Sequence, residues 1–337
     1  MDVSVSVWLI TCAVILGLFV FDFFSHVRVP HAPSLKESGT WSAVYITIAI
    51  VFGAFVWWKW GGTFGGEYFA GYVTEKALSV DNLFVFVIIM AKFAVPVEYQ
   101  QKVLLLGIVM ALGMRGIFIA VGAAAINTYS WVFYLFGAFL IFTAIKLVRE
   151  SDDPVEHEEQ RETRLERFVK RFLRTHDSYD GDKLFTRVNG KRLATPMLMV
   201  LIVIGFTDVL FALDSIPAIY GLTSEPYLVF TANAFALMGL RQLYFLLGGL
   251  LDRLVYLSIG LSIILAFIGA KLVLHALHEN TLPFVNGGEH VSVPEISTPL
   301  SLSVIVGVLV ITTVASLIRS RGSATPKDAE TSKSLNG

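Results

Sequence analysis

Two short polar stretches interrupt the long apolar runs of this chain: Thr74-Glu75-Lys76-Ala77-Leu78-Ser79-Val80-Asp81-Asn82 and Thr207-Asp208-Val209-Leu210-Phe211-Ala212-Leu213-Asp214-Ser215. Each stretch reads Thr, an acid, five residues, Asp and a small polar residue. On a continuous helix, residues seven apart fall about 20° short of two full turns, so they lie on one face. Each stretch therefore predicts a polar band on an otherwise apolar helix. Ionised groups in such a helix usually face a cavity, a partner or a substrate path.

The composition excludes several classes of protein. Of 337 residues, 55% are hydrophobic and 16% are charged, which is too apolar for an ordinary soluble domain. The net charge of -1 gives no reason to expect nucleic-acid binding. The single cysteine, Cys12, excludes an internal disulfide and a multi-Cys metal site. No Gly-rich phosphate loop, Ser-His-Asp spacing or HExxH motif occurs, so we expect neither an enzyme nor a resident cofactor.

Runs of about 20 apolar residues, the length that spans a bilayer, predict about nine transmembrane helices. They are Val3–Phe24, Trp41–Trp58, Glu67–Met90, Val103–Ile126, Ser130–Val148, Pro196–Tyr220, Tyr227–Leu250, Leu254–Leu274 and Pro299–Ile318. The first run follows no basic segment and precedes no Ala-x-Ala-like cleavage site, so we interpret it as an anchor rather than a removable signal peptide. The predicted fold class is all-α, a multi-pass protein of the inner or plasma membrane.

The distribution of Lys and Arg predicts the orientation. The connection 149–193 alone carries eleven Lys or Arg residues, and placing the N-terminus outside puts it and the basic tail inside. This connection begins with an acidic cluster and continues with apolar residues at helical spacing, which predict an amphipathic helix on the inner leaflet or on a partner protein. An Asn-Gly turn within Phe185–Leu193 predicts a hairpin. The polar tail 319–337 is expected to be disordered.

Internal similarity extends beyond the two polar stretches. Ala111-Leu-Gly-Met-Arg115 resembles Leu237-Met-Gly-Leu-Arg241, and both copies end in Lys-Leu-Val. Residues 67–148 and 195–274 therefore predict two copies of a three-helix unit, and the odd number of helices makes the second copy inverted. Residues 1–66 would form two preceding helices, 149–194 a charged cytoplasmic loop, and 275–318 an external loop and a last helix. Pro217 directly after the second polar stretch predicts a break in that helix.

Four long motifs resemble the TerC family of integral membrane proteins, which is named for tellurite resistance and includes Alx-like members. The motifs are Glu75-Lys-Ala-Leu-Ser-Val-Asp-Asn-Leu-Phe-Val-Phe86, Val188-Asn-Gly-Lys-Arg-Leu-Ala-Thr-Pro196, Phe206-Thr-Asp-Val-Leu-Phe-Ala-Leu-Asp-Ser-Ile-Pro-Ala218 and Asn233-Ala-Phe-Ala-Leu-Met-Gly-Leu-Arg-Gln-Leu-Tyr-Phe245. The resemblance covers roughly residues 65–275. It implies a relation to LysE-type exporters and export of manganese, or a role in tellurite resistance, alkaline response or membrane-protein assembly. Many relatives carry Glu where this chain has Gly205, which implies one acid fewer near the site.

The polar stretches supply the candidate metal ligands, with carboxylates joined by neutral oxygens. The predicted set is Glu75, Asp81, Asn82, Asp208, Asp214 and Ser215. Hard oxygen ligands favour magnesium, calcium or manganese as the transported cation, and repulsion between the acids suggests exchange with protons. In the alternative, Lys76, Arg115 and Arg241 pair with the acids and no ion binds. His275 and His278 form at most a weak second metal site.

Two functions follow from these observations. The favoured one is export of a divalent metal, manganese first, from the acidic intramembrane site. The competing one is a membrane factor that transports nothing and acts through loop 149–193 on a membrane-protein partner, for instance in tellurite resistance, stress response or membrane-protein assembly.

Overall fold

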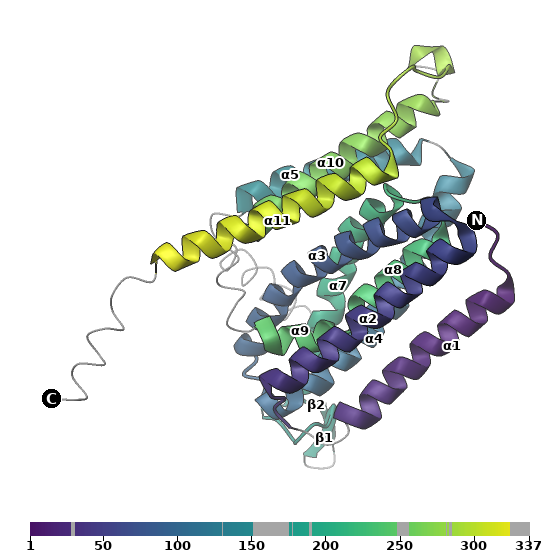
Figure 1. Cartoon of the computed structure of the whole chain (residues 1–337). Helices are drawn as coiled ribbons and strands as arrows, with labels where there is room; N and C mark the ends of the chain where they lie inside the picture. The colour runs from purple at the N-terminus through teal and green to yellow at the C-terminus, as the bar shows by residue number, and fades with distance from the viewer. Residues whose placement is uncertain are drawn as a thin grey trace.

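A computed structural model describes residues 1–27, 31–129, 131–150, 175–176, 178–188, 191–247, 256–280, 282 and 285–323. The regular secondary structure of the described part is helical apart from one short hairpin (Figure 1). The helices are α1 (Val5–Asp22, continued by the π-helical turn η1, Phe23–Val27), α2 (Leu35–Trp60), α3 (Gly62–Lys92), α4 (Val97–Thr128), α5 (Val132–Glu150), α7 (Pro196–Tyr220), α8 (Pro226–Leu237), α9 (Leu240–Leu247), α10 (Leu257–His278) and α11 (Thr298–Ser323), with a 3-10 turn, η3, at Asn286–Gly288. The strands are β1 (Phe185–Val188) and β2 (Lys191–Ala194).

The nine predicted spans correspond to these helices, and the all-α membrane class is confirmed. Seven helices in the described residues are long and apolar enough to cross a membrane: α1 with η1, α2, α4, α5, α7, α10 and α11. The other two predicted spans are α3, a 31-residue helix that carries the first polar stretch, and the pair α8–α9. The last helix extends to Ser323, so the first residues of the predicted disordered tail are helical, while 324–337 lie outside the described residues.

Local sequence explains where several helices begin. The Ser34 hydroxyl accepts a hydrogen bond from the Glu37 backbone N–H at 3.2 Å and caps α2. Pro196 and Pro226 occupy the first turns of α7 and α8, where a missing N–H costs nothing. Gly61 has φ 98°, which glycine adopts without strain, and it turns the chain directly from α2 into α3.

The helix break lies in a different helix from the one predicted. Pro217 is inside α7, which continues to Tyr220, so the break predicted at Asp214–Pro217 is wrong. Pro217 removes one backbone donor close to the end of the helix, and the remaining turn still forms. The break instead separates α8 from α9 after Met238, where Gly239 has φ 76°.

The helices form two groups that meet at α3 and α7. In Figure 1, α5, α10 and α11 lie together on one side, and α1 lies on the opposite side of the molecule. Helix α3 contacts α2, α8 and α9 in one group and α10 and α11 in the other, while α7 contacts α4 and α5. The two helices that carry the polar stretches are therefore the ones enclosed by the rest of the protein.

Polar contacts identify the two ends of the bundle. At one end the Met1 ammonium pairs with Glu225 at 2.6 Å, and Thr223 donates to Glu67 at 2.6 Å. At the other end, Tyr179 donates to the Phe93 carbonyl at 2.8 Å. Segments predicted to share a side of the membrane thus meet in the structure, while the N-outside orientation stays a prediction.

The hairpin predicted in the long connection is confirmed for its strands. β1 and β2 pair antiparallel with Phe185 opposite Ala194, and the Asn-Gly turn residues lie outside the described residues. Lys102 near the start of α4 pairs with Asp182 at 2.5 Å and attaches the segment before the hairpin to the bundle. The acidic cluster after Glu150 and the predicted amphipathic helix also lie outside the described residues.

Candidate functional site

The candidate site is an ionic network enclosed by α3, α4, α7 and α8. Glu75 comes from α3, Arg115 from α4, Asp208 from α7 and Asn233 from α8. Their residues are between 0% and 2% exposed to solvent. Charged groups buried to this degree are tolerated in proteins only when they are paired and hydrogen-bonded.

Arg115 is the centre of the network. Its Nε donates to Asp208 Oδ2 at 3.2 Å and its Nη2 to Oδ1 at 3.1 Å, a bidentate arrangement. Its Nη1 donates to Glu75 Oε1 and to Asn233 Oδ1, the latter at 2.9 Å. One guanidinium therefore joins the two polar stretches to each other and to two further helices.

The Glu75 carboxylate is only half satisfied. Its Oε1 accepts from Arg115 and from the Ser79 hydroxyl at 3.3 Å. Its Oε2 is buried and has no hydrogen-bond partner among the described residues, and the same holds for the hydroxyls of Thr74 and Ser215. Buried oxygens without a donor are costly, and they are the type of atom that a hard cation or a proton binds.

Lys76 caps the end of α8 at the break between α8 and α9, next to this network. Its Nζ donates to the carbonyl oxygens of Ala236 at 2.9 Å and Met238 at 3.2 Å. These carbonyls belong to the last turn of α8 and to the residue after it, where the helix supplies no N–H. A cation at a helix C-terminus also interacts favourably with the helix dipole.

The two remaining acids lie on the neighbouring stripe of each helix and are half-buried. Asp81 accepts a hydrogen bond from Ser258 of α10 at 3.5 Å, and Asp214 accepts one from Thr143 of α5 at 2.9 Å. Asn82 and Ser215 are buried on the same stripes as Glu75 and Asp208.

The predicted ligands thus fall into two sets. Glu75 and Asp208 meet at Arg115, whereas Asp81 and Asp214 contact α10 and α5. Nowhere in the described ranges do three His, Cys, Asp or Glu side chains lie close enough together to hold a metal ion. The structure therefore does not join the six predicted ligands into one metal site. Arg115 lies between Glu75 and Asp208 as their counter-charge, whereas Lys76 contacts backbone carbonyls.

Comparison with known proteins identifies the family. Residues 60–324 match the family described as "Integral membrane protein TerC family". This chain belongs to the TerC family. It is 52% identical to "Uncharacterized membrane protein Rv2723" of Mycobacterium tuberculosis over 96% of this chain and 82% of that relative. It is 41% identical to "Uncharacterized membrane protein STKORF319" of Myxococcus xanthus over 98% of this chain and 97% of the relative.

A third relative carries a functional name. The "Putative membrane-bound redox modulator Alx" of Escherichia coli strain K12 is 37% identical over 85% of each chain. No solved structure matches the chain. Membership of the TerC family confirms the resemblance seen in the motifs and, with the seven apolar helices, identifies an integral membrane protein.

The family resemblance bears on Gly205, three residues before Asp208. Gly205 is buried, and a Cβ atom at this position would lie 2.6 Å from Cε of Met110 on α4. A side chain at this position of a TerC protein with this backbone would therefore enter the space now filled by a flexible methionine.

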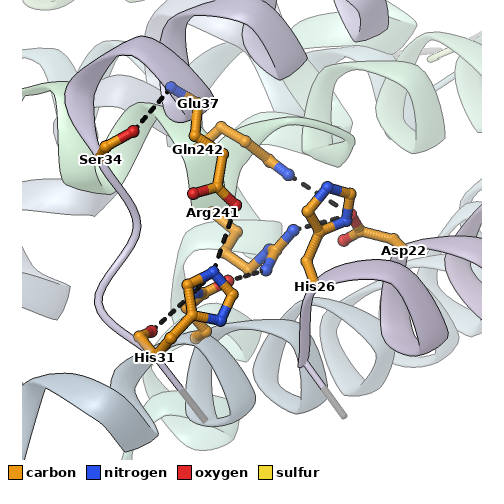
Figure 2. Close-up of polar contacts among 8 residues, drawn as sticks. Asp22, His26, His31, Ser34, Glu37, Arg241 and Gln242 are labelled. Carbon is orange, nitrogen blue, oxygen red and sulfur yellow. Dashed lines mark hydrogen bonds and ion pairs between the residues drawn. The ribbon is translucent and has the colours of Figure 1, made fainter. Parts of the chain in front are cut away.

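Asp22 lies near the end of the first apolar run, a position that suggests contact with lipid headgroups, but the structure buries it. It is 6% exposed, and its Oδ1 accepts hydrogen bonds from Tyr45 at 2.8 Å and from Arg241 at 2.7 Å (Figure 2). Arg241 also donates to Gln101 of α4. This TerC protein therefore has a second buried ionic cluster, and Arg241 pairs there instead of with the polar stretches.

Proposed function

We propose that this TerC-family protein exports a divalent metal ion, with manganese favoured, in exchange for protons. The observation that carries the proposal is the meeting of Glu75 from α3 and Asp208 from α7 on one buried arginine. Two carboxylates from separate helices converge in the apolar interior, which is expensive unless function requires it. In this proposal α3 and α7 are equivalent helices of two inverted halves, with the site between them.

Exchange of one divalent cation for two protons would leave the charge of the network unchanged. Glu75 and Asp208 share Arg115 as their counter-charge, so this contact holds one more carboxylate than guanidinium. In the proposal, metal binding displaces protons from the acids of the polar stretches, because an unneutralised charge in a low-dielectric interior is costly.

The observed contacts represent the metal-free arrangement in this scheme. Arg115 occupies the position between Glu75 and Asp208 that a cation would take, so metal entry requires the guanidinium to release at least one carboxylate. Glu75 Oε2, which has no hydrogen-bond partner among the described residues, is the first oxygen open to the ion. To complete an oxygen-rich shell of the kind that manganese, magnesium and calcium accept, Asp81 and Asp214 would have to leave their contacts with Ser258 and Thr143 and join Asn82 and Ser215 at the ion.

Reconstitution of the full chain in vesicles tests the proposal. We expect uptake of manganese driven by a proton gradient, and we expect Glu75→Gln and Asp208→Asn each to reduce the flux by about tenfold or more, equivalent to about 1.4 kcal/mol. Asp182→Asn, an acid outside the helices, is the matched control and should keep the wild-type flux. Manganese flux at the wild-type rate in both Glu75→Gln and Asp208→Asn would end the proposal.

The competing function, a membrane factor that acts through its cytoplasmic loop, predicts a different result. Replacement of residues 151–174 by a neutral linker should leave transport largely intact but abolish the action of a scaffold. The name redox modulator carried by a relative receives no support from this sequence, because Cys12 alone cannot form an internal disulfide.

A further inference from the structure

The hairpin of β1 and β2 lies at one end of the helix bundle, directly before a helix that is long and apolar enough to cross the membrane (Figure 1). β2 ends at Ala194, and α7 begins two residues later at Pro196. The Thr195 backbone N–H donates to the Leu184 carbonyl at 3.0 Å, and its hydroxyl donates to the Lys183 carbonyl at 2.6 Å. These bonds hold the base of the hairpin at the start of α7, so both strands lie close to the membrane surface.

One face of the hairpin is basic and exposed. Alternate side chains of a strand point to the same face, so Phe185 and Arg187 share one face of β1. The register places Arg192 of β2 directly opposite Arg187, and all three residues are exposed. Residues 183–192 contain four Lys or Arg and no Asp or Glu. We call Phe185, Arg187 and Arg192 the basic face of the hairpin.

The two arginines of the basic face are in an unfavourable register. Directly opposite residues of an antiparallel pair have Cβ atoms about 5 Å apart, and like charges at this spacing destabilise the pair. Within the part of the chain that the structure describes, neither Arg187 nor Arg192 has an ion pair or a hydrogen bond from its side chain. An anion bound between the two guanidinium groups would relieve their repulsion.

The acids closest to the basic face in the sequence do not supply this anion. Asp180 pairs with Lys183 at 3.1 Å and also accepts a hydrogen bond from Thr186 at 2.9 Å. Asp182 pairs with Lys102 of α4 at 2.5 Å. Both carboxylates therefore already have a cationic partner, and the positive charge of the basic face is left for a ligand.

The contact between Arg192 and Phe185 prepares the face for a phosphate group. The guanidinium carbon of Arg192 lies over the Phe185 ring, 4.0 Å from its centroid. Stacking on a ring fixes a guanidinium but does not use its N–H donors. Arginine binds phosphate through two parallel hydrogen bonds from these donors, which makes phosphate the anion that suits the basic face best.

The order of the residues along the hairpin matches the layers of a membrane surface. Phe185 pairs with Ala194 at the end of the hairpin next to α7, whereas the Arg187–Arg192 pair lies two residues, about 7 Å, further from that end. Aromatic side chains are enriched at the membrane interface, and phosphates lie in the headgroup layer beyond it. The orientation predicted from Lys and Arg places the hairpin on the cytoplasmic side, where the leaflet carries anionic lipids.

We propose that the basic face of the hairpin binds the headgroup phosphate of an anionic phospholipid, with Arg187 and Arg192 as the donors. The acidic cluster Glu150–Glu159 of the same connection is the competing occupant. Six Lys or Arg follow it between residues 160 and 174, so counter-charges nearer in the sequence than the basic face are available to it. The lipid site shares no residue with the candidate metal ligands and does not depend on metal transport.

Native mass spectrometry of the full chain in detergent tests the proposal by measuring the affinity for the most tightly bound lipid. Phosphatidylglycerol is the anionic probe, and phosphatidylcholine is its neutral counterpart. We expect the wild-type protein to prefer phosphatidylglycerol. The double variant Arg187→Gln/Arg192→Gln should bind phosphatidylglycerol about thirtyfold more weakly, about fivefold for each arginine, and phosphatidylcholine as before. Both arginines are exposed, so the thermal unfolding of this variant should equal that of the wild type.

The matched control is Lys183→Gln, which removes an exposed cation of the same segment whose charge Asp180 already offsets. Its phosphatidylglycerol affinity should stay within about twofold of the wild-type value. Equal phosphatidylglycerol affinities in the wild type and the double variant overturn the proposal and leave the basic face to an acidic protein partner. Preference for phosphatidylglycerol that arises only after the acids of Glu150–Glu159 are changed to amides overturns it too, because that segment is then the occupant.

Discussion

Arg115 holds Asp208 by two parallel hydrogen bonds, Nε to Oδ2 at 3.2 Å and Nη2 to Oδ1 at 3.1 Å. Only a guanidinium offers this planar pair of donors, and the same group also reaches Glu75. A single side chain of α4 therefore sets the spacing between the polar stretches of α3 and α7. Because this contact links four helices through buried charges, it is the first target for substitution.

Removal of the guanidinium should destabilise the protein strongly. Arg115→Gln leaves the carboxylates of Glu75 and Asp208 buried without their counter-charge, and the expected loss is about 3 to 5 kcal/mol. Thermal unfolding of the purified protein measures it, with Arg149→Gln at the exposed end of α5 as the control. Neutralising the partners as well, in the triple variant with Glu75→Gln and Asp208→Asn, should restore part of the stability. No recovery in that variant would mean that Arg115 acts mainly by packing.

Lys76 should stabilise the break between α8 and α9. Lys76→Met keeps the length of the side chain but removes both donors to the carbonyls of Ala236 and Met238, and each orphaned group costs about 1 to 3 kcal/mol. Hydrogen exchange measured by mass spectrometry should show faster exchange in the peptides around Gly239, whereas Lys36→Met at the exposed start of α2 should change nothing. Unchanged exchange around Gly239 would contradict the capping role.

The attachment of the hairpin segment should depend on pH. The hydrogen bond from Lys102 lowers the pKa of Asp182 below its ordinary value, against an opposing effect of burial. For a carboxyl whose pKa is lower in the folded state, the stabilisation is present above the ordinary pKa near 4 and is lost as the pH falls through the folded-state pKa. Limited proteolysis of residues 175–195 should therefore accelerate only at strongly acidic pH.

Two variants separate the contributions to that pH dependence. Asp182→Asn should make the segment more susceptible at neutral pH and weaken the acid-induced change. Asp180 has a lowered pKa because of hydrogen bonds from Thr186 and Lys183 within the same segment, so Asp180→Asn should affect the hairpin itself but not its attachment to α4. An acid transition that is identical in the wild type and Asp182→Asn would remove the Lys102 contact as its cause.

The shared buried face of each polar stretch could be predicted from the sequence because its cause is local. Seven-residue spacing on a continuous helix places Glu75 over Asn82 and Asp208 over Ser215, and all four are buried. The contacts of Asp22 depend instead on Arg241, which is more than two hundred residues away in the sequence. The apolar residues around Asp22 therefore do not indicate that its side chain is buried in an ion pair. One signal could have revealed this pair: an acid near the end of one apolar run, and an arginine in another run at a similar distance from the same membrane surface.

The position of the helix break could not be predicted from the sequence either, because it also depends on a distant residue. Proline is the usual sign of a broken helix, but Pro217 is so near the end of α7 that the chain tolerates it. The break follows from the positive φ of Gly239 and from the ammonium group that Lys76 brings from α3. A glycine within an apolar run does not by itself show whether the helix breaks there, because that depends on the contacts that other helices make at this position.

Two glycines of the apolar helices should differ in how much the same substitution destabilises the protein. A Cβ at Gly137 of α5 would lie 2.8 Å from the carbonyl oxygen of Gly269 on α10, so Gly137→Ala must push the two backbones apart. Close approach at small residues is a main source of helix association in membranes, and the expected loss is about 1 to 3 kcal/mol. At Gly205 the same added atom meets only the end of Met110, which is 40% exposed and can turn away, so Gly205→Ala should cost less than about 1 kcal/mol. Thermal unfolding of both variants in one detergent measures the contrast, and equal losses would show that backbone contact between α5 and α10 does not limit their packing.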